Sequence, residues 1–237
     1  FTGKVPLTTL KLSEELVKIS PKSLTKVLYA NSGSESNDTA IKMAWYYQNA
    51  LGKTKKKKII SRYRGYHGVT IMSGSLTGMD YAHKGFDMPR DFVVHTDSPH
   101  YYKDSLTQES SSEFVNRLLK NLEKLIIKEG PQNIAAMILE PIQGAGGVII
   151  PPDNYLKGVQ KLLKKNDILL IVDEVICGFG RTGNMFGCDT FQIKPDMMVI
   201  AKGLSSGYIP ISALLINEEI YETISDFSSI NNVFGHG

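Results

Sequence analysis

The chain has 237 residues, of which 42% are hydrophobic and 22% are charged, and its formal net charge is +3. This composition is ordinary for a soluble globular domain and excludes disordered and collagen-like chains. No apolar run reaches membrane-spanning length, and no signal peptide opens the chain. The two cysteines, Cys177 and Cys188, fit no zinc or redox motif. We therefore expect a cytoplasmic setting and no metal site.

Helical and extended patterns alternate along the chain, which predicts a mainly parallel sheet with covering helices. No internal repeat or low-complexity linker is present, so one domain is expected. The expected helices carry apolar faces at Leu12, Leu16 and Ile19, at Ile41, Ala44 and Trp45, at Phe114, Leu118 and Leu122, and at Leu156, Val159 and Leu163. The expected strands are Lys58–Tyr63, Phe92–His95, Ile134–Leu139, Ile168–Val172, Met197–Ile200 and Ala213–Ile216.

The polar stretch NSGSESND, Asn31–Asp38, lies between the apolar residues Val27–Tyr29 and a helical pattern. It places Gly33 and Ser34 at the start of that helix, where free amides and the helix dipole favour an anion such as phosphate. Ordinary capping of the helix by serine or asparagine gives the same pattern, so this stretch alone leaves both interpretations open.

A lysine tract, Lys53–Lys58, leads into the next strand. We interpret the tract as a solvated turn, because the aromatic and arginine pattern of a nucleic-acid surface does not accompany it. The motif GYHG, Gly65–Gly68, follows the strand and places Tyr66 at the strand's end. A tyrosine at this position either packs in the core or covers a bound ring.

Two later strands each deliver a carboxylate into a glycine-rich turn. In LEPIQGAGG, Leu139–Gly147, the carboxylate is Glu140, and in ILLIVDEVICGFGRTG, residues 168–183, it is Asp173. The short apolar run before Asp173 predicts a strand buried on both faces. Ligands bind at the carboxyl edge of such sheets, although Asp173 could instead cap the next segment.

The stretch MMVIAKGLSSGYIP, Met197–Pro210, delivers Lys202 at a strand end in the same way. A lysine and an aspartate at strand ends, an anion-binding helix start and an aromatic ring are the parts that hold a phosphorylated pyridine aldehyde. In this hypothesis Lys202 forms an imine with the aldehyde and Asp173 faces the ring nitrogen. The helix start binds the phosphate, and Tyr66 covers the ring.

Five motifs in chain order resemble those of the class III aminotransferases, which are fold-type I pyridoxal-phosphate enzymes. They are NSGSESNDTAIKMAWYY, YHG, EPIQGAGGVIIPP, IVDEVICGFGRTGNMFG and PDMMVIAKGLSSGYIPISALL. The resemblance implies that residues 1–237 form the α/β large domain of such an enzyme, with a mostly parallel central sheet, one antiparallel strand at Ala213–Ile216, and helices on both faces. It further implies a homodimer with the active site at its interface, and an N-terminal segment and a small C-terminal domain outside this chain.

The resemblance also assigns catalytic roles. Lys202 matches the lysine that holds pyridoxal phosphate as an internal aldimine and shuttles a proton. Asp173 matches the aspartate that pairs with the pyridinium nitrogen, and so favours the ring form that accepts electrons. Val175 is expected on one ring face and Tyr66 on the other.

The remaining matches concern the surroundings of the cofactor. Gly33 and Ser34 match the phosphate-binding pair, and Gln143 matches a side chain that approaches the ring hydroxyl in many relatives. The matches extend to Glu140 and His67, which lie in family motifs at the site, and to Arg181, which is expected to form a structural ion pair.

HTDSPHYY, GAGG and SSGYIPISA resemble the branch that uses ω-amino acids or amines as donors and pyruvate as acceptor. The expected function is transfer of an amino group from such a donor to a 2-oxo acid, with no nucleic-acid or membrane partner. Gln143 departs from this branch, where methionine is common.

Two alternatives stay open, and a third is disfavoured. An aminomutase, racemase or decarboxylase of the same cofactor class would keep these residues, and a truncated copy would be an inactive scaffold. ILLIVDE also resembles the acidic strand of P-loop NTPases, but the glycine-rich loop of that class is not present.

Overall fold

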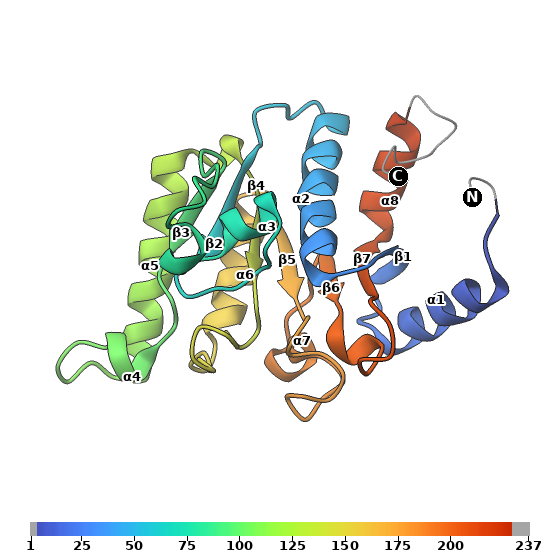
Figure 1. Ribbon diagram of the computed structural model, residues 1–237. Coiled ribbons are helices and arrows are strands. Elements are labelled where there is room, and N and C mark those ends of the chain that lie inside the picture. Colours follow the sequence, from blue (N-terminus) through green and yellow to red (C-terminus); the bar gives the residue numbers. More distant parts are fainter. Residues whose placement is uncertain (1–3, 229–237) are drawn as a thin grey trace.

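A seven-stranded sheet with the order β1-β7-β6-β5-β4-β2-β3 forms the centre of the computed structural model, which describes residues 4–228 (Figure 1). The outermost parts of the expected domain, residues 1–3 and 229–237, lie outside the described residues. The strands are β1 (Leu24–Ala30), β2 (Lys58–Arg62), β3 (Val93–Thr96), β4 (Ile134–Leu139), β5 (Leu169–Asp173), β6 (Met197–Ile200) and β7 (Ser212–Asn217).

The strand directions determine where side chains gather. Strands β3, β2, β4, β5 and β6 are parallel to their neighbours, so their carboxyl ends meet at one edge of the sheet. Strand β7 is antiparallel to both β6 and β1, as expected for Ala213–Ile216. The fold is therefore the mostly parallel, helix-covered sheet that the sequence predicted.

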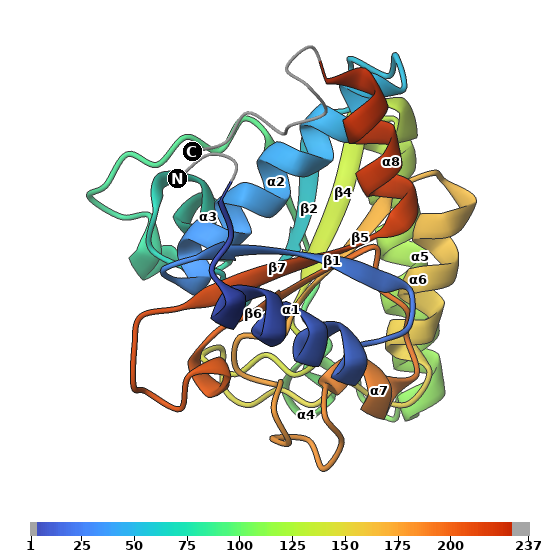
Figure 2. The same cartoon turned by 90° about the vertical axis from the view of Figure 1, so that its right-hand side faces the viewer.

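Helices cover both faces of the sheet. In Figure 2, α2 and α3 lie on one side of the sheet, and α5 and α6 lie on the other. Helix α8 packs with α2, and α1 packs with the opposite core. The helices are α1 (Leu7–Ile19), α2 (Gly33–Ala50), α3 (Ile71–Leu76), α4 (Tyr101–Asp104), α5 (Ser111–Glu129), α6 (Tyr155–Lys165), α7 (Gly187–Phe191) and α8 (Glu218–Phe227), with short 3-10 turns at Asp80–Ala82, Pro131–Asn133 and Lys202–Leu204.

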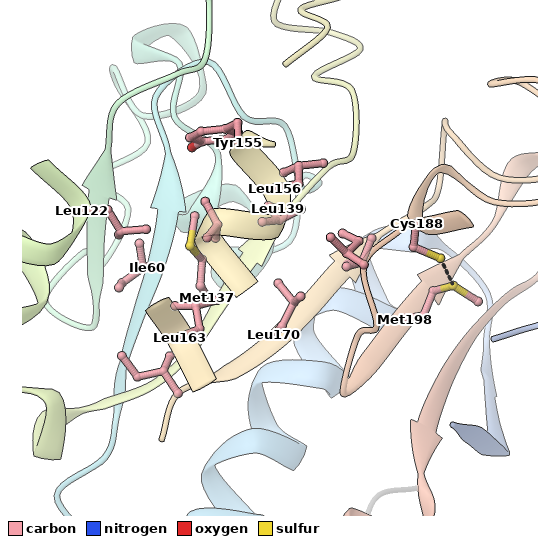
Figure 3. Close-up of a cluster of buried hydrophobic side chains, with 14 of the residues drawn as sticks. Ile60, Leu122, Met137, Leu139, Tyr155, Leu156, Leu163, Leu170, Cys188 and Met198 are labelled. Atoms are coloured by element: carbon pink, nitrogen blue, oxygen red, sulfur yellow. Dashed lines mark hydrogen bonds between the residues drawn. The ribbon is translucent and has the colours of Figure 1, made fainter. Parts of the chain in front are cut away.

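The larger core lies between the sheet and helices α5 and α6. Both helices are amphipathic, and their apolar faces are buried while lysines occupy the outer faces. Each fully buried leucine or isoleucine contributes about 1.5 to 3 kcal/mol of hydrophobic stabilisation. Figure 3 shows this interface, with side chains from both helices and from the sheet, including Leu122, Tyr155, Leu156, Leu163, Ile60, Met137, Leu139 and Leu170.

The predicted strands agree with the structure to within one residue at each end. The main difference is β1, of which the sequence indicated only Val27–Tyr29. Its polar first half hides the strand pattern, because Thr25 and Lys26 turn toward α8. Thr25 Oγ1 donates to Glu218 Oε2 at 2.5 Å, and Lys26 Nζ donates to the same oxygen at 2.9 Å.

The lysine tract is not the fully solvated turn that we expected. Lys53 and Lys55 are exposed, but Lys56 is only 4% exposed. Its ammonium donates to the carbonyl oxygens of Ile134 and Asp167 and lies 3.3 Å from the Asp167 carboxylate. These acceptors compensate the loss of water, although burial lowers the pKa of Lys56.

Within residues 4–228, no helix has both the length and the hydropathy needed to cross a bilayer.

Candidate active site

A cavity of about 350 Å³ opens at the carboxyl edge of the parallel strands. The loops after β2, β4, β5 and β6 and the start of α2 contribute its walls, because these segments all meet at that edge. Eight of the nine predicted cofactor-site residues line it, namely Gly33, Ser34, Tyr66, His67, Glu140, Asp173, Val175 and Lys202.

Asp173 ends β5 and is 4% exposed. Its Oδ2 lies 2.9 Å from Nδ1 of His67 and accepts a hydrogen bond of the same length from Nδ2 of Asn37, while Oδ1 accepts from the amide of Val175 at 3.1 Å. No lysine or arginine forms an ion pair with this carboxylate among the described residues. A buried carboxylate held by these hydrogen bonds can face a cationic ring nitrogen.

Helix α2 begins at Gly33 beside the cavity. Ser32 caps it by accepting a hydrogen bond from the Glu35 amide at 3.2 Å. The amides of Gly33 and Ser34 lie in the first turn, where backbone N–H groups have no partner within the helix. This helix start can therefore bind an anion.

One face of α2 also holds the segment that carries Tyr66. Ser34 Oγ accepts from the Val69 amide at 3.1 Å, and Asn37 Nδ2 donates to the His67 carbonyl oxygen at 2.7 Å. One position further on, Asp38 Oδ1 accepts from the Ser73 amide at 2.9 Å. The spacing follows from helix geometry, because residues three and four apart share a face.

Gly68 is the point of closest approach in this contact. Its φ is +135°, and a Cβ there would lie 2.4 Å from both Ser34 Oγ and Ser73 Oγ. Gly68→Ala should therefore lower the free energy of unfolding by about 2 to 3 kcal/mol, measured by urea denaturation. Gly52→Ala is the matched control, because Gly52 also has a positive φ, of +73°, but open space around it. If both variants lost the same free energy of unfolding, the contact between Gly68 and α2 would not be tight.

Glu140 connects two loops of the site. Its Oε1 accepts from the Tyr66 amide at 3.0 Å, and its Oε2 accepts from the Gly144 amide at 2.9 Å. Burial raises the pKa of Glu140, and these two hydrogen bonds oppose the rise. Below it, the buried guanidinium of Arg62 donates to the Glu140 carbonyl oxygen. Glu140 therefore holds the Tyr66 loop and the glycine-rich turn together.

Gln143 is the predicted residue that the structure does not bring into the cavity lining. It is fully buried, and its Oε1 accepts from Ser98 Oγ at 2.8 Å. Its Nε2 donates to the carbonyl oxygen of Tyr63 at 2.9 Å. The motif places Gln143 near the site, but these partners direct its side chain toward β3 and the loop after β2.

Glu174, which the sequence analysis did not single out, closes the base of the loop after β5. It is fully buried and accepts from the Gly187 amide at 2.9 Å and from the Cys188 amide at 2.6 Å. Burial raises its pKa to about 7. The motif VDEV contains two adjacent acids, Asp173 and Glu174, and so drew attention to this segment. Only the fold shows that Asp173 faces the cavity and that Glu174 faces α7.

The raised pKa of Glu174 predicts a pH-dependent stability. The folded state binds the proton of the Glu174 carboxyl more tightly than the unfolded chain, in which the glutamate pKa is 4.5. The contribution of this proton to the free energy of unfolding is therefore largest below pH 4.5 and is lost as the pH rises to about 7. The full effect is on the order of 3 kcal/mol. Glu174→Gln removes the titration. Its unfolding free energy, measured by urea denaturation, should lie further below that of the parent at about pH 5 than at about pH 8.

The exposed Glu14→Gln variant is the control for this comparison. A difference between parent and Glu174→Gln that does not change with pH would contradict the prediction.

Lys202 lines the cavity two residues after β6, and its side chain is exposed. Its φ is +43°, a value that a lysine adopts rarely and that active sites often retain. In the described part of the chain its side-chain nitrogen has neither a hydrogen bond nor an ion pair. Arg181, also exposed, forms no ion pair with any residue from 4 to 228, contrary to expectation.

Comparison with known proteins identifies the family of this chain. The model of the family described as Aminotransferase class-III matches residues 2–236. Gamma aminobutyrate transaminase 1, mitochondrial, of Solanum lycopersicum is 50% identical over 238 residues, which cover 100% of this chain and 46% of that protein. Gamma aminobutyrate transaminase 3, chloroplastic, of the same species is 51% identical over 238 residues, again covering 100% and 46%.

The solved structures agree with this result. The omega transaminase from Pseudomonas jessenii in complex with PMP superposes with a TM-score of 0.97 at 51% identity. The match covers 100% of this chain and 52% of that chain. The chain thus spans about half the length of the relatives that it matches.

Proposed function

Because the chain belongs to the class III aminotransferases, we propose that it carries the cofactor site of an enzyme that transfers an amino group from an ω-amino acid or amine to a 2-oxo acid such as pyruvate. The observation that supports this proposal most directly is a single cavity lined by an exposed lysine, a buried aspartate and the start of a long helix. Residues 1–237 are proposed to form the cofactor-binding large domain.

The cavity fits pyridoxal phosphate in size and in chemistry. Its volume, about 350 Å³, lies within the range of small-molecule sites. A Cβ at Gly33 would lie 2.9 Å from Val175 Cγ2, so only glycine leaves the helix start open beside that side chain. The Ser34 oxygen already accepts from Val69, which leaves the hydroxyl proton for an anion.

The proposal assigns each end of the cofactor to residues of this chain. The Gly33 and Ser34 amides would bind the phosphate, and Asp173 would face the ring nitrogen. Tyr66 and Val175 would pack on the ring. Pyridoxal phosphate supplies an electron sink for the carbon that bears the transferred amino group.

The chain's own residues would supply the proton chemistry. The Lys202 amine would hold the cofactor covalently and, once released, would carry a proton between substrate and cofactor. Three hydrogen bonds would hold the Asp173 carboxylate in place, and a carboxylate beside the ring nitrogen would favour the protonated ring. His67 and Glu140 would maintain these positions, because they hold Asp173 and the Tyr66 loop.

Borohydride reduction in the presence of pyridoxal phosphate tests this proposal directly. A phosphopyridoxyl group is expected on the peptide that contains Lys202, detected by mass mapping. The exposed Lys194 serves as an internal control, because it should stay unmodified. A folded protein that is labelled on surface lysines alone would contradict the proposed cofactor site.

An activity screen is required to identify the amino donor and the 2-oxo acid acceptor. The relatives named gamma aminobutyrate transaminases favour an ω-amino acid donor, and a similar omega transaminase variant described as engineered for the synthesis of bulky amines favours an amine donor. γ-Aminobutyrate and a primary arylalkylamine should therefore be assayed with pyruvate and with 2-oxoglutarate. Loss of the donor amine that depends on an added 2-oxo acid is expected. A change in the donor without any acceptor would instead indicate a mutase, racemase or decarboxylase.

We further propose that the protein is a homodimer. The turn that borders the cavity carries Tyr208 and Ile209, which are 88% and 58% exposed and would be covered by a second subunit. Sedimentation velocity should give twice the monomer mass. The cytoplasmic location stays a prediction, because the two tomato relatives are named as mitochondrial and chloroplastic.

A further inference from the structure

Asn37 occupies the junction between three walls of the cavity. It lies one turn into α2, is 1% exposed, and lines the cavity. Its Nδ2 donates to Asp173 Oδ2 at 2.9 Å and to the His67 carbonyl oxygen at 2.7 Å. A single carboxamide therefore links α2, the loop after β2 and the end of β5.

The bond to Asp173 is the more consequential of the two. Asp173 has no ion-pair partner among lysines and arginines in residues 4–228, so its negative charge depends on hydrogen-bond donors. Those donors are Asn37, His67 and the Val175 amide. Asn37 differs from His67 in that its Nδ2 group can only donate, whereas the role of His67 Nδ1 depends on the tautomer.

The carbonyl oxygen of the Asn37 side chain indicates which bonds fix the orientation of that side chain. Asn37 Oδ1 is buried and finds no donor within the described part of the chain. A buried unpaired oxygen costs free energy, so the side chain is oriented by its two donated bonds and not by its oxygen. Because Asn37 lines the cavity, an occupant could supply the missing donor.

We propose that Asn37 is a positioning residue that keeps the Asp173 carboxylate directed at the ring nitrogen of the bound cofactor. This inference rests on the proposed function, because it assumes a pyridine ring in the cavity. Hydrogen bonds to buried charged groups are strong, so loss of the amide should weaken cofactor binding about 10- to 100-fold.

Asn37→Leu is the primary test, because leucine has a similarly branched side chain and cannot donate. Pyridoxamine phosphate is the probe, since it cannot bond covalently to Lys202, and its affinity is measured by fluorescence titration. We expect binding weakened about 10- to 100-fold, whereas inorganic phosphate, which has no ring nitrogen, should bind as in the parent. Asn49→Leu is the matched control on the same helix, because Asn49 accepts from Lys57 Nζ outside the cavity.

A second variant covers the case in which leucine prevents folding. Asn37→Ser shortens the side chain without adding an apolar group, and a loss of pyridoxamine phosphate affinity in the same direction is expected. Binding equal to that of the parent, in a folded variant, would overturn the inference alone. Failure of the parent to bind pyridoxamine phosphate and to be labelled at Lys202 would overturn both the inference and the proposed function.

Discussion

Replacing Lys202 with alanine should lower transamination at least about 10⁴-fold, because in the proposed function one side chain supplies both the covalent attachment and the proton carrier. The fold should persist. The Lys202 side chain is exposed and makes no hydrogen bond among the described residues, so its removal leaves no buried group unpaired. The backbone is the sensitive part, since φ is +43° at this position.

The measurement is the initial rate with a donor that the parent uses, together with the thermal unfolding midpoint. Lys161→Ala on the outer face of α6 is the control, because it removes an exposed lysine far from the cavity lining. A Lys202→Ala protein that turned over like the parent would refute the assignment of the reactive lysine.

Asp173→Asn should give the next largest effect, a loss of about 10² to 10³ in turnover together with weaker cofactor binding. Asparagine keeps the shape of the side chain but not its charge. The ring nitrogen would then lose the partner that keeps it protonated, and the ring would become a poorer electron acceptor. Asparagine would also present an amide group where Asn37 and His67 now approach Oδ2.

Single-turnover absorbance measurements separate the loss of turnover from the weaker cofactor binding. The enzyme can be saturated with cofactor before the reaction starts, so the measured rate then reports the chemical step alone. The exposed Asp153→Asn variant, at the start of α6, is the matched control. Unchanged turnover at saturating cofactor would mean that Asp173 does not act on the ring nitrogen.

The sequence was most informative where one residue type dominates a segment. Strand β4 consists of six buried apolar residues, so its bounds could be predicted from the run Ile134–Leu139 alone. The residues after such strands were also predictable, because a carboxylate or an ammonium at a strand end is unusual. This rule placed Glu140, Asp173 and Lys202 around one cavity.

Tertiary partners were not predictable in the same way. Lys56 lies in a run of lysines, and only the carbonyl oxygens of Ile134 and Asp167 explain its burial. The direction of the Gln143 side chain depends on Ser98, which is distant in sequence. The local sequence pattern contains no information on such contacts, because a lysine or a glutamine can occur in many different surroundings.

The position of β1 in the sheet has a consequence for biosynthesis. Leu24 pairs with Asn217, and among residues 4–228 β1 pairs only with β7. A ribosome must therefore synthesise every residue between β1 and β7 before β1 can form its ladder of hydrogen bonds. Until then the central parallel strands can associate, but the helix start that follows β1 has no fixed place beside them. Contacts of such long sequence separation form slowly, so the nascent chain exposes an unpaired strand, and the helix start joins the binding cavity only after β7 has been made.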